Sequence, residues 1–249
     1  MRLSSNDEKV SELNKIIKNA KKVVFFGGAG VSTASGISDF RSEKGLYNIK
    51  SKYGTSYEEM LSHEYFFNHP LIFYKFYKEA MINKSAKPNL AHIALSKFEK
   101  DYPDKLTIIT QNIDNLHQLA GSKNVLELHG SVYRNNCLQC GEFYDVDFIL
   151  NSNNLPICPK CGGLVKPDVV LYQEQLNEEI LDKAIRACTE ADVMIVGGTS
   201  LMVYPAAYLI QYFYGKTLIM INKQVTQYDS FANYVFHDDI TKVLPLLLN

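Results

Sequence analysis

Residues 23–26, VVFF, lead directly into a glycine-rich loop, and this combination restricts the fold more than any other feature of the chain. Four apolar residues without polar alternation predict a short strand that is buried on both faces, as in a parallel sheet. Small residues in the loop let a ligand approach the backbone, and free N–H groups in a turn before a helix bind anions. We therefore predict that Gly28 and Gly30 lie against the phosphate of a nucleotide.

The loop differs from the dinucleotide-binding fingerprint GxGxxG, because Thr33 stands where the third glycine is expected. An ordinary dehydrogenase also carries an acidic residue about 20 positions further on, which binds the ribose. Residues 48–51 contain no acid, so hydride transfer of the usual kind is disfavoured. Asp39, Phe40 and Arg41 follow the loop instead, and an acid, a ring and a guanidinium together can cover a cofactor and hold its phosphates.

Apolar runs alternate with amphipathic segments along most of the chain, which is typical of a parallel sheet with helices on both faces. After the first strand, we predict strands at residues 106–110, 125–128, 192–196, 217–221 and 234–236. We predict helices near residues 89–100, 177–190 and 205–213. An aromatic segment and a cysteine-rich segment interrupt the alternation. The sequence thus predicts an α/β protein with a doubly wound sheet and two insertions.

The aromatic segment, residues 57–81, is predicted to form two helices, the second beginning near Pro70. Its many phenylalanine and tyrosine rings fit a helical module that packs on the main domain. They also fit an apolar wall for a substrate or a cofactor. Both interpretations can hold together.

Two CxxC pairs separated by 17 residues predict a metal site. This spacing is typical of zinc sites in which each pair presents two thiolates to one tetrahedral ion. Four protein ligands leave no position for a substrate, so we predict one structural Zn²⁺ that holds a small ribbon together. Redox-active dithiols are the alternative. The predicted ligands are Cys137, Cys140, Cys158 and Cys161, whereas Cys188 is predicted to be a core thiol.

The overall charge and hydropathy disfavour other functions. A formal net charge of -1 gives no general attraction to nucleic acid or to anionic membranes. Arg134, Lys160 and Lys166 are the cations near the cysteines, too few for a surface that tracks phosphates. We find no apolar signal region and no run approaching the roughly 18 apolar residues of a membrane span. Together with thiols suited to a reducing compartment, this predicts a cytoplasmic protein.

Polar residues follow several predicted strands, and ligands of parallel sheets bind beyond the carboxyl ends of the strands. His129 stands at one such end, where a neutral imidazole could act as a general base or could be structural. Gln111, Asn112 and Asp114 are either a polar turn or a site for ribose hydroxyls and a carboxamide. The same two interpretations apply to Thr199, Ser200 and Asn222.

Taken together, these motifs resemble the sirtuins, the NAD-dependent protein deacylases. The resemblance is carried, in chain order, by GAGVSTASGISDFR, TQNID, LHG, the paired CxxC motifs, KPDVVLYQE, GGTSL and the strand-terminal Asn222. It covers almost the whole chain. It implies a Rossmann-type NAD-binding domain made of residues 1–41, 89–130 and 168–249. A helical module at residues 42–88 and a zinc ribbon at residues 131–167 would form a small domain, with the acyl-lysine peptide in the cleft between the domains.

The resemblance also implies the roles of individual residues. His129 would be the catalytic base, and Asn112 would lie beside the reacting ribose. The peptide would add by backbone pairing to an edge strand formed by Val169, Val170, Leu171 and Tyr172. NAD would contact Gly28, Ala29, Gly30, Thr33, Asp39, Phe40, Arg41, Gln111, Ile113, Asp114, Thr199, Ser200, Asn222, Asp239 and Ile240.

The reaction of the family removes an acetyl or other acyl group from a protein lysine and releases nicotinamide and O-acyl-ADP-ribose. The resemblance implies that Asp114 binds the carboxamide of nicotinamide, that Phe40 shields the reacting carbon and that His129 takes a proton through the ribose hydroxyls. Protein ADP-ribosyl transfer or NAD hydrolysis on the same fold is an alternative, because it shares the first step. A zinc-ribbon module that binds nucleic acid or a partner protein is a third class.

The chain departs from the pattern of the family at several positions. Ser38 replaces a proline, and Leu171 and Gln173 replace a phenylalanine and a glycine near the peptide. Members that prefer succinyl or malonyl groups carry Tyr-x-x-Arg in the helical segment. Residues 74–77 of this chain, YKFY, lack the arginine, so we expect acetyl or longer apolar acyl groups, although Lys75 or Lys78 could partly substitute.

Overall fold

The computed structural model describes residues 5–38 and 53–249. Asp39, Phe40 and Arg41, which we expect to contact the cofactor, lie outside the described residues. None of the helices in the described ranges is long and apolar enough to cross a membrane.

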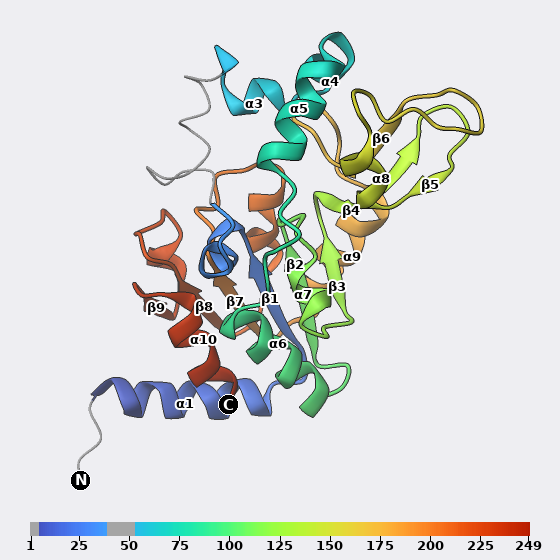
Figure 1. Cartoon of the computed structure of the whole chain (residues 1–249). Helices are drawn as coiled ribbons and strands as arrows, with labels where there is room; N and C mark the ends of the chain where they lie inside the picture. Colours follow the sequence, from blue (N-terminus) through green and yellow to red (C-terminus); the bar gives the residue numbers. More distant parts are fainter. Residues whose placement is uncertain (1–4, 39–52) are drawn as a thin grey trace.

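A six-stranded parallel sheet forms the centre of the molecule (Figure 1). Its strands lie in the order β3-β2-β1-β7-β8-β9. The chain thus adds β2 and β3 on one side of β1 and later adds β7, β8 and β9 on the other side. The strand order therefore reverses at β1, which is where ligands bind in doubly wound sheets. The bounds are β1 (Val23–Gly27), β2 (Leu106–Thr110), β3 (Val125–Glu127), β7 (Val193–Gly197), β8 (Thr217–Ile221) and β9 (Tyr234–Phe236).

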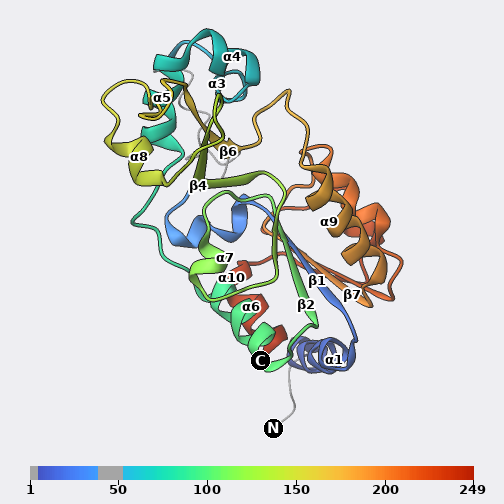
Figure 2. The same ribbon diagram turned by 90° about the vertical axis from the view of Figure 1, so that its right-hand side faces the viewer.

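Helices cover both faces of this sheet, as the sequence predicts (Figure 2). One face packs against α1 (Ser5–Asn19), α6 (Leu90–Asp101) and α10 (Ile240–Leu248). The other packs against α9 (Glu178–Glu190) and a 3-10 helix, Ala206–Tyr212. Between β2 and β3 lies a short helix, α7 (Leu116–Leu119).

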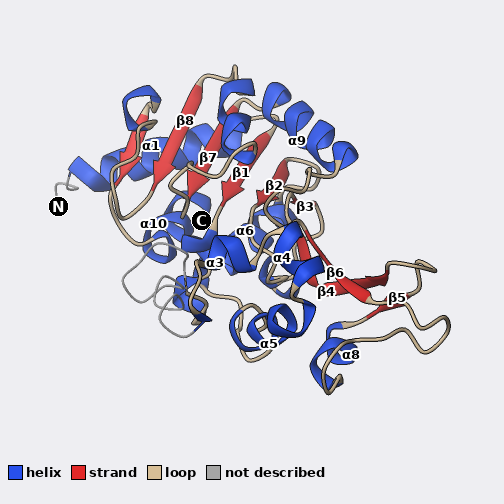
Figure 3. Cartoon of the chain, turned by 90° about the horizontal axis from the view of Figure 1, so that it is seen from above, coloured by secondary structure: helices blue, strands red, loops and turns tan. Residues whose placement is uncertain are grey.

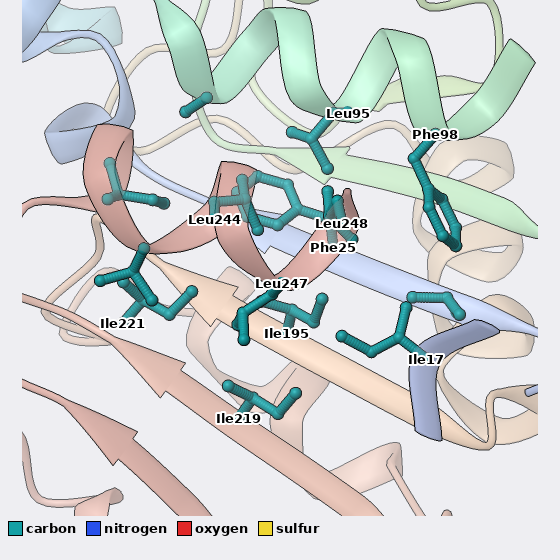
Figure 4. Close-up of a cluster of buried hydrophobic side chains, with 14 of the residues drawn as sticks. Ile17, Phe25, Leu95, Phe98, Ile195, Ile219, Ile221, Leu244, Leu247 and Leu248 are labelled. Carbon is teal, nitrogen blue, oxygen red and sulfur yellow. The ribbon is translucent and has the colours of Figure 1, made fainter. Parts of the chain in front are cut away.

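The apolar strand at the centre of the sheet contributes to both layers of the core. Phe25 belongs to the cluster under α6 and α10, where Leu95 and Leu244 also lie (Figure 4). Phe26 points to the opposite face and packs with Met194 and other residues beneath α9. Because successive side chains of a strand alternate between faces, a run of apolar residues is required here. The predicted strand that is buried on both faces is confirmed.

A small antiparallel sheet in the order β5-β4-β6 stands beside the large one (Figure 3). It consists of β4 (Gly130–Cys137), β5 (Phe143–Tyr144) and β6 (Val165–Val169). The helix α8 (Val146–Asn151) lies between β5 and β6 in the chain and contacts β4. Its apolar residues and the aromatic helices share a third core, separate from the two around the large sheet. The rings of Phe73, Tyr74 and Tyr77 are completely buried there. The rings are therefore packing residues, as one interpretation predicts, but they pack mainly against the small sheet and not against the large one.

The aromatic segment contains three helices where we predict two: α3 (Tyr57–Met60), α4 (His63–Asn68) and α5 (Pro70–Ala80). The extra boundary arises at Ser62, whose side chain accepts a hydrogen bond from the N–H of Tyr65 and so begins a new helix. The predicted boundary at Pro70 is confirmed. The helix predicted near residues 205–213 is a 3-10 helix at residues 206–212, and the apolar residues at the end of the sequence lie in α10.

Candidate active site and metal centre

The glycine-rich loop after β1 lies directly against the residues that follow β7. The N–H of Gly30 donates to the carbonyl of Gly198 at 2.8 Å, and the N–H of Gly28 donates to the carbonyl of Gly197 at 3.3 Å. A Cβ at Gly30 would lie 2.8 Å from the Cα of Gly198, which is too close for any side chain. The small residues therefore allow two backbone segments to approach, and two short 3-10 turns, Ala29–Val31 and Thr33–Ser35, follow in place of a long helix.

A hydrogen-bonded group joins this loop to the end of β2. The hydroxyl of Ser32 donates to Oδ2 of Asp114 at 2.6 Å, and the side-chain amide of Asn112 donates to Ser32 Oγ at 3.0 Å. Burial raises the pKa of Asp114, while hydrogen bonds from Ser32 and from the N–H of Leu116 oppose that rise. The structure thus brings Asn112 and Asp114 together, as predicted.

The sequence analysis missed Ser32, which is completely buried at the centre of this group. Its position between Val31 and Thr33, in a loop already assigned to ligand binding, could have singled it out. What the sequence does not show is that Ser32 pairs with Asp114, which lies 82 positions further along the chain.

His129 lies between the two sheets, after the end of β3 and just before β4. Its Nδ1 lies 2.9 Å from the carbonyl oxygen of Gln111. Because a carbonyl only accepts, the neutral ring carries its proton on Nδ1, which leaves Nε2 unprotonated. Burial lowers the pKa of His129, and the hydrogen bond to Gln111 raises it in part. The imidazole is therefore mainly neutral near pH 7, as a general base must be.

Gly130 is required next to this histidine. Its φ is 73°, and a Cβ there would lie 1.8 Å from the carbonyl oxygen of Asp168 on β6. The antiparallel pairing of Gly130 with Val169 on β6 consequently fixes the direction in which the backbone of His129 enters the site.

Side chains at the ends of β2, β7 and β8 form a second connected group. The amide of Gln111 donates to the hydroxyl of Thr199 at 3.0 Å, and the N–H of Thr199 donates to Oδ1 of Asn222 at 2.9 Å. The Nδ2 of Asn222 is buried and has no acceptor among the described residues. A buried donor without a partner is costly, so this group fits a ligand that supplies an acceptor. Ser200 follows Thr199 and is partly buried.

The remaining predicted cofactor contacts differ in their surroundings. Asp239 caps α10 by accepting a hydrogen bond from the N–H of Thr241 at 2.9 Å. Partial burial raises its pKa, but hydrogen bonds from Thr241 and Lys223 lower the pKa of Asp239 to about 2. Ile240 packs against Gly197 at the end of β7, where a Cβ on the glycine would lie 2.4 Å from Ile240 Cδ1. Ala29 and Thr33 lie partly exposed in the loop, and Ile113 packs on the third core.

The predicted peptide segment, residues 169–172, is an extended strand only as far as Val169, where β6 ends. Val170 donates its N–H to the carbonyl of His129 at 3.0 Å, which places the segment beside the candidate base. Tyr172 forms an isolated parallel bridge with Ser62. The expected edge strand over all four residues is therefore not observed, because the backbone after Val169 turns to pair with the start of α4.

A cavity of about 460 Å³ lies beyond this bridge, between Tyr172, Gln173 and residues of α3 and α4. His129 does not line it. The candidate base and the polar strand ends therefore define the site by their hydrogen bonds and not by this cavity.

The four predicted metal ligands come together at the far end of the small sheet. Their Sγ atoms all lie within 4.8 Å of one another, with Cys137 and Cys161 separated by 3.4 Å and Cys140 and Cys158 by 3.7 Å. A tetrahedral zinc with ordinary Zn–S bonds requires sulfur separations of about 3.8 Å. The four cysteines of this group form no disulfide, so all four sulfur atoms can bind a metal ion. The donor set therefore fits one Zn²⁺.

The backbone around the cysteines supports the same conclusion. Gly141 and Gly162, each directly after a CxxC pair, have φ values of 72° and 78°, which glycine adopts without strain. The hydroxyl of Tyr144 lies 3.0 Å from the sulfur of Cys158. Cys188 is a residue of α9 and is buried in the core, and burial raises the pKa of its thiol to about 12, so its prediction as a core thiol is confirmed.

Comparisons with known proteins agree with this geometry. Residues 28–205 match the Sir2 family. NAD-dependent protein deacetylases of Clostridium acetobutylicum and Clostridium perfringens are 54% and 56% identical to this chain. The first alignment covers 97% of this chain and 98% of the relative, and the second covers 96% and 98%.

Solved structures show the same likeness. A Sir2 protein with a p53 peptide and NAD⁺ superposes with a TM-score of 0.84 at 36% identity, covering 94% of this chain and 95% of the other. Another, bound to a propionylated peptide, gives a TM-score of 0.83 at 37% identity, with 95% of each chain covered. The match to the family over most of the chain, the similarity of these relatives and the shared fold lead to one conclusion: the chain belongs to the Sir2 family.

Proposed function

We propose that this protein is an NAD-dependent protein-lysine deacetylase, which transfers the acetyl group of an acetyl-lysine to ADP-ribose and releases nicotinamide. The observation that carries the proposal is the neutral His129, whose Nδ1 is held by the carbonyl of Gln111 while Nε2 is left to accept a proton. The two clostridial relatives, which are more than half identical to this chain, are named NAD-dependent protein deacetylases. Within the proposal, residues 1–41, 89–130 and 168–249 form the NAD-binding domain, while residues 42–88 and 131–167 form the small domain.

The residues at the strand ends fit NAD. When bound, NAD supplies the ribose carbon from which nicotinamide departs and to which the acyl oxygen becomes attached. Asn222 would satisfy its unpaired Nδ2 with an acceptor of the cofactor, beside Thr199 and Gln111. The loop at Gly28 and Gly30 would lie against the phosphates. Ala29, Thr33, Ser200, Asp239 and Ile240 complete the proposed contacts, with Asp39, Phe40 and Arg41 from outside the described residues.

The group made by Ser32, Asn112 and Asp114 would orient the nicotinamide end. The second oxygen of the Asp114 carboxyl accepts from the N–H of Leu116 at 2.9 Å, so both oxygens are held in place before any ligand binds. A fixed carboxyl can bind the carboxamide of nicotinamide in one orientation, which lowers the reorganisation that the reaction requires. Ile113, on the same turn, contributes an apolar surface.

His129 would take a proton from the ribose hydroxyls once nicotinamide has departed. Its low pKa keeps the imidazole ready to accept a proton at neutral pH. The N–H of Val170 donates to the carbonyl of His129, so the base and the proposed peptide segment, Val169, Val170, Leu171 and Tyr172, are held in one arrangement. The acyl-lysine is therefore expected to enter close to the base.

The four cysteines would hold one Zn²⁺ that crosslinks the two loops of the small sheet and performs no chemistry. A group of four cysteines suited to binding a metal ion is typical of a reducing compartment, which supports a cytoplasmic location. Tyr74 and Tyr77, at the positions of the missing Tyr-x-x-Arg motif, are buried in the third core, where the hydroxyl of Tyr74 donates to the carbonyl of Val165. Without an arginine in this stretch we favour acetyl and longer apolar acyl groups.

The proposal is tested by the release of nicotinamide from NAD with an acetyl-lysine peptide, a succinyl-lysine peptide or no peptide, in the wild type and in His129→Ala. We expect release that depends on the acetyl peptide, with an equal amount of free lysine, and a loss of both in the variant. The matched control is His237→Ala, because His237 is an exposed histidine directly after β9. This variant should retain activity. NAD cleavage without deacylated peptide would instead assign ADP-ribosyl transfer or NAD hydrolysis.

A further inference from the structure

The carboxylate of Glu174 joins three segments around the peptide segment. Its Oε2 accepts a hydrogen bond from the N–H of Leu171 at 2.9 Å and lies 3.0 Å from the ammonium of Lys166. Its Oε1 lies 3.0 Å from Nδ1 of His63, the first residue of α4. One side chain thus connects β6, the start of α4 and residues 169–172, which adjoin one another in the fold (Figure 3).

The pair between Glu174 and Lys166 is shielded from water. Their side chains are only 19% and 16% exposed, which distinguishes the pair from the surface ion pairs of this protein. Burial raises the pKa of Glu174, but bonds from Leu171, His63 and Lys166 outweigh it and lower the pKa below its ordinary value. The ammonium of Lys166 also donates to the carbonyl of Val169 at 3.1 Å. A charged, partly buried network therefore holds both ends of the peptide segment.

The backbone next to Glu174 adopts a conformation that needs such support. Gln173 has a φ of 75°, in the left-handed region that is disfavoured for a residue with a side chain. Its Oε1 accepts from the N–H of Glu64 at 3.0 Å. Tyr172 donates its N–H to the carbonyl of Leu61 and accepts from the N–H of His63, both at 2.9 Å. The segment is therefore held against α4 by bonds on each side of a strained residue.

From these contacts, and resting on the deacetylase function proposed above, we propose that Glu174 is a positioning residue, which fixes residues 169–172 in the conformation that an acyl-lysine peptide pairs with. Glu174 bonds to the peptide segment, to β6 and to α4, whereas the groups assigned to NAD bond to one another at the ends of β2, β7 and β8. Loss of the carboxylate should therefore weaken binding of the peptide while binding of NAD is retained.

The test measures kcat and separate KM values for an acetyl-lysine peptide and for NAD, in the wild type and in purified variants. We expect Glu174→Ala to raise the KM for the peptide about tenfold, as loss of a charged hydrogen bond predicts, with kcat and the KM for NAD within about twofold. Glu174→Gln keeps an acceptor for the Leu171 N–H, so it should restore part of the affinity. Lys166→Met removes the same ion pair and also the bond to the carbonyl of Val169, so it should raise the KM for the peptide at least as much as Glu174→Gln.

Glu179→Ala is the matched control, because it removes an ion pair with Lys183 at 2.6 Å on the exposed surface of α9. Its KM values should equal those of the wild type. An unchanged peptide KM in Glu174→Ala, or equal increases in both KM values, would overturn the positioning role. If Glu174→Ala does not fold, the comparison of Glu174→Gln with Lys166→Met decides in the same way. A wild type without activity on the acetyl peptide would refute the proposed function instead.

Discussion

Ser32 and Asp114, which are 82 positions apart in the chain, are joined by a hydrogen bond of 2.6 Å between the glycine-rich loop and the end of β2. This bond holds one carboxyl oxygen in a buried place, where the charged form of the acid is otherwise disfavoured. The bond therefore couples the position of the loop to the protonation of the acid.

We expect Ser32→Ala to lower kcat about tenfold, because Asp114 loses the donor that orients it. Burial already raises the pKa of Asp114, and the Ser32 bond opposes that effect, so its loss should raise the pKa further. The acid limb of the pH–rate profile should consequently move to higher pH. Ser122→Ala is the control, because Ser122 is also buried but its hydroxyl has no partner in the described ranges. A profile of Ser32→Ala that coincides with the wild type would contradict this role.

Acid should destabilise the fold through two buried histidines. Burial lowers the pKa of His92 to about 4, and burial together with neighbouring His92 lowers that of His117 to about 3. In the unfolded chain the two imidazoles bind protons below about pH 6.5, whereas in the folded chain they stay neutral until the pH approaches their lowered pKa values. Stability is therefore complete above about pH 6.5 and falls as the pH drops toward the folded pKa values, by up to roughly 1.4 kcal/mol per unit for each histidine.

The variant His117→Phe tests this dependence, because both ring nitrogens of His117 lack partners within residues 5–38 and 53–249 and its ring already packs against Phe25. Urea unfolding at pH 7.5, 5.5 and 4.5 should show a smaller loss of stability in the variant than in the wild type. His237→Phe, on the surface, should keep the wild-type dependence. Equal losses in all three proteins would exclude His117 as a cause.

Removal of the metal should act on the third core first. We expect one Zn²⁺ per chain, and a chelator or Cys140→Ser should remove it, lower the melting temperature and abolish deacetylation. Cys188→Ala changes a buried thiol outside the metal site and should keep the full metal content. Metal analysis and thermal unfolding measure both effects. Full activity of a protein without zinc would show that the cysteines are not needed to hold the small sheet.

Gln173 should reveal the strain in the peptide segment. Gln173→Ala and Gln173→Gly both lose the bond from the N–H of Glu64, but only glycine adopts a φ of 75° without strain. We therefore expect the glycine variant to be more stable than the alanine variant by about 1 kcal/mol in urea unfolding. The opposite order would mean that the backbone relaxes when the side chain is removed.

The sequence predicts the large sheet almost without error, because its strands are short apolar runs bounded by polar or glycine residues. The predicted ranges 106–110, 217–221 and 234–236 are those of β2, β8 and β9. The helix predicted at 205–213 is observed as a 3-10 helix, a type that periodicity does not separate from an α-helix at this length. Hydrophobic periodicity also does not predict helix boundaries that are set by side-chain caps, such as the one at Ser62.

The sequence predicts most residues of the candidate site but not the hydrogen bonds that connect them. His129, Asn112 and Asp114 are recognisable as polar groups at strand ends, and the cysteines by their spacing alone. Ser32 and Glu174 were missed as partners because each acts through contacts that only the folded chain creates. The end of the strand at Val169 depends on the backbone of Leu61 and His63, more than a hundred positions away.

The packing of α1 on α10 has a consequence for the newly synthesised chain. The side-chain amide of Asn14 donates to the carbonyl of Leu247 at 3.1 Å, so the first helix finds its partner in the last one. The second edge of the central strand β1 pairs with β7, which is synthesised much later than β1. During synthesis, the earliest elements therefore remain incompletely covered until nearly all of the described chain has been made, which exposes them to chaperones and proteases for that whole interval.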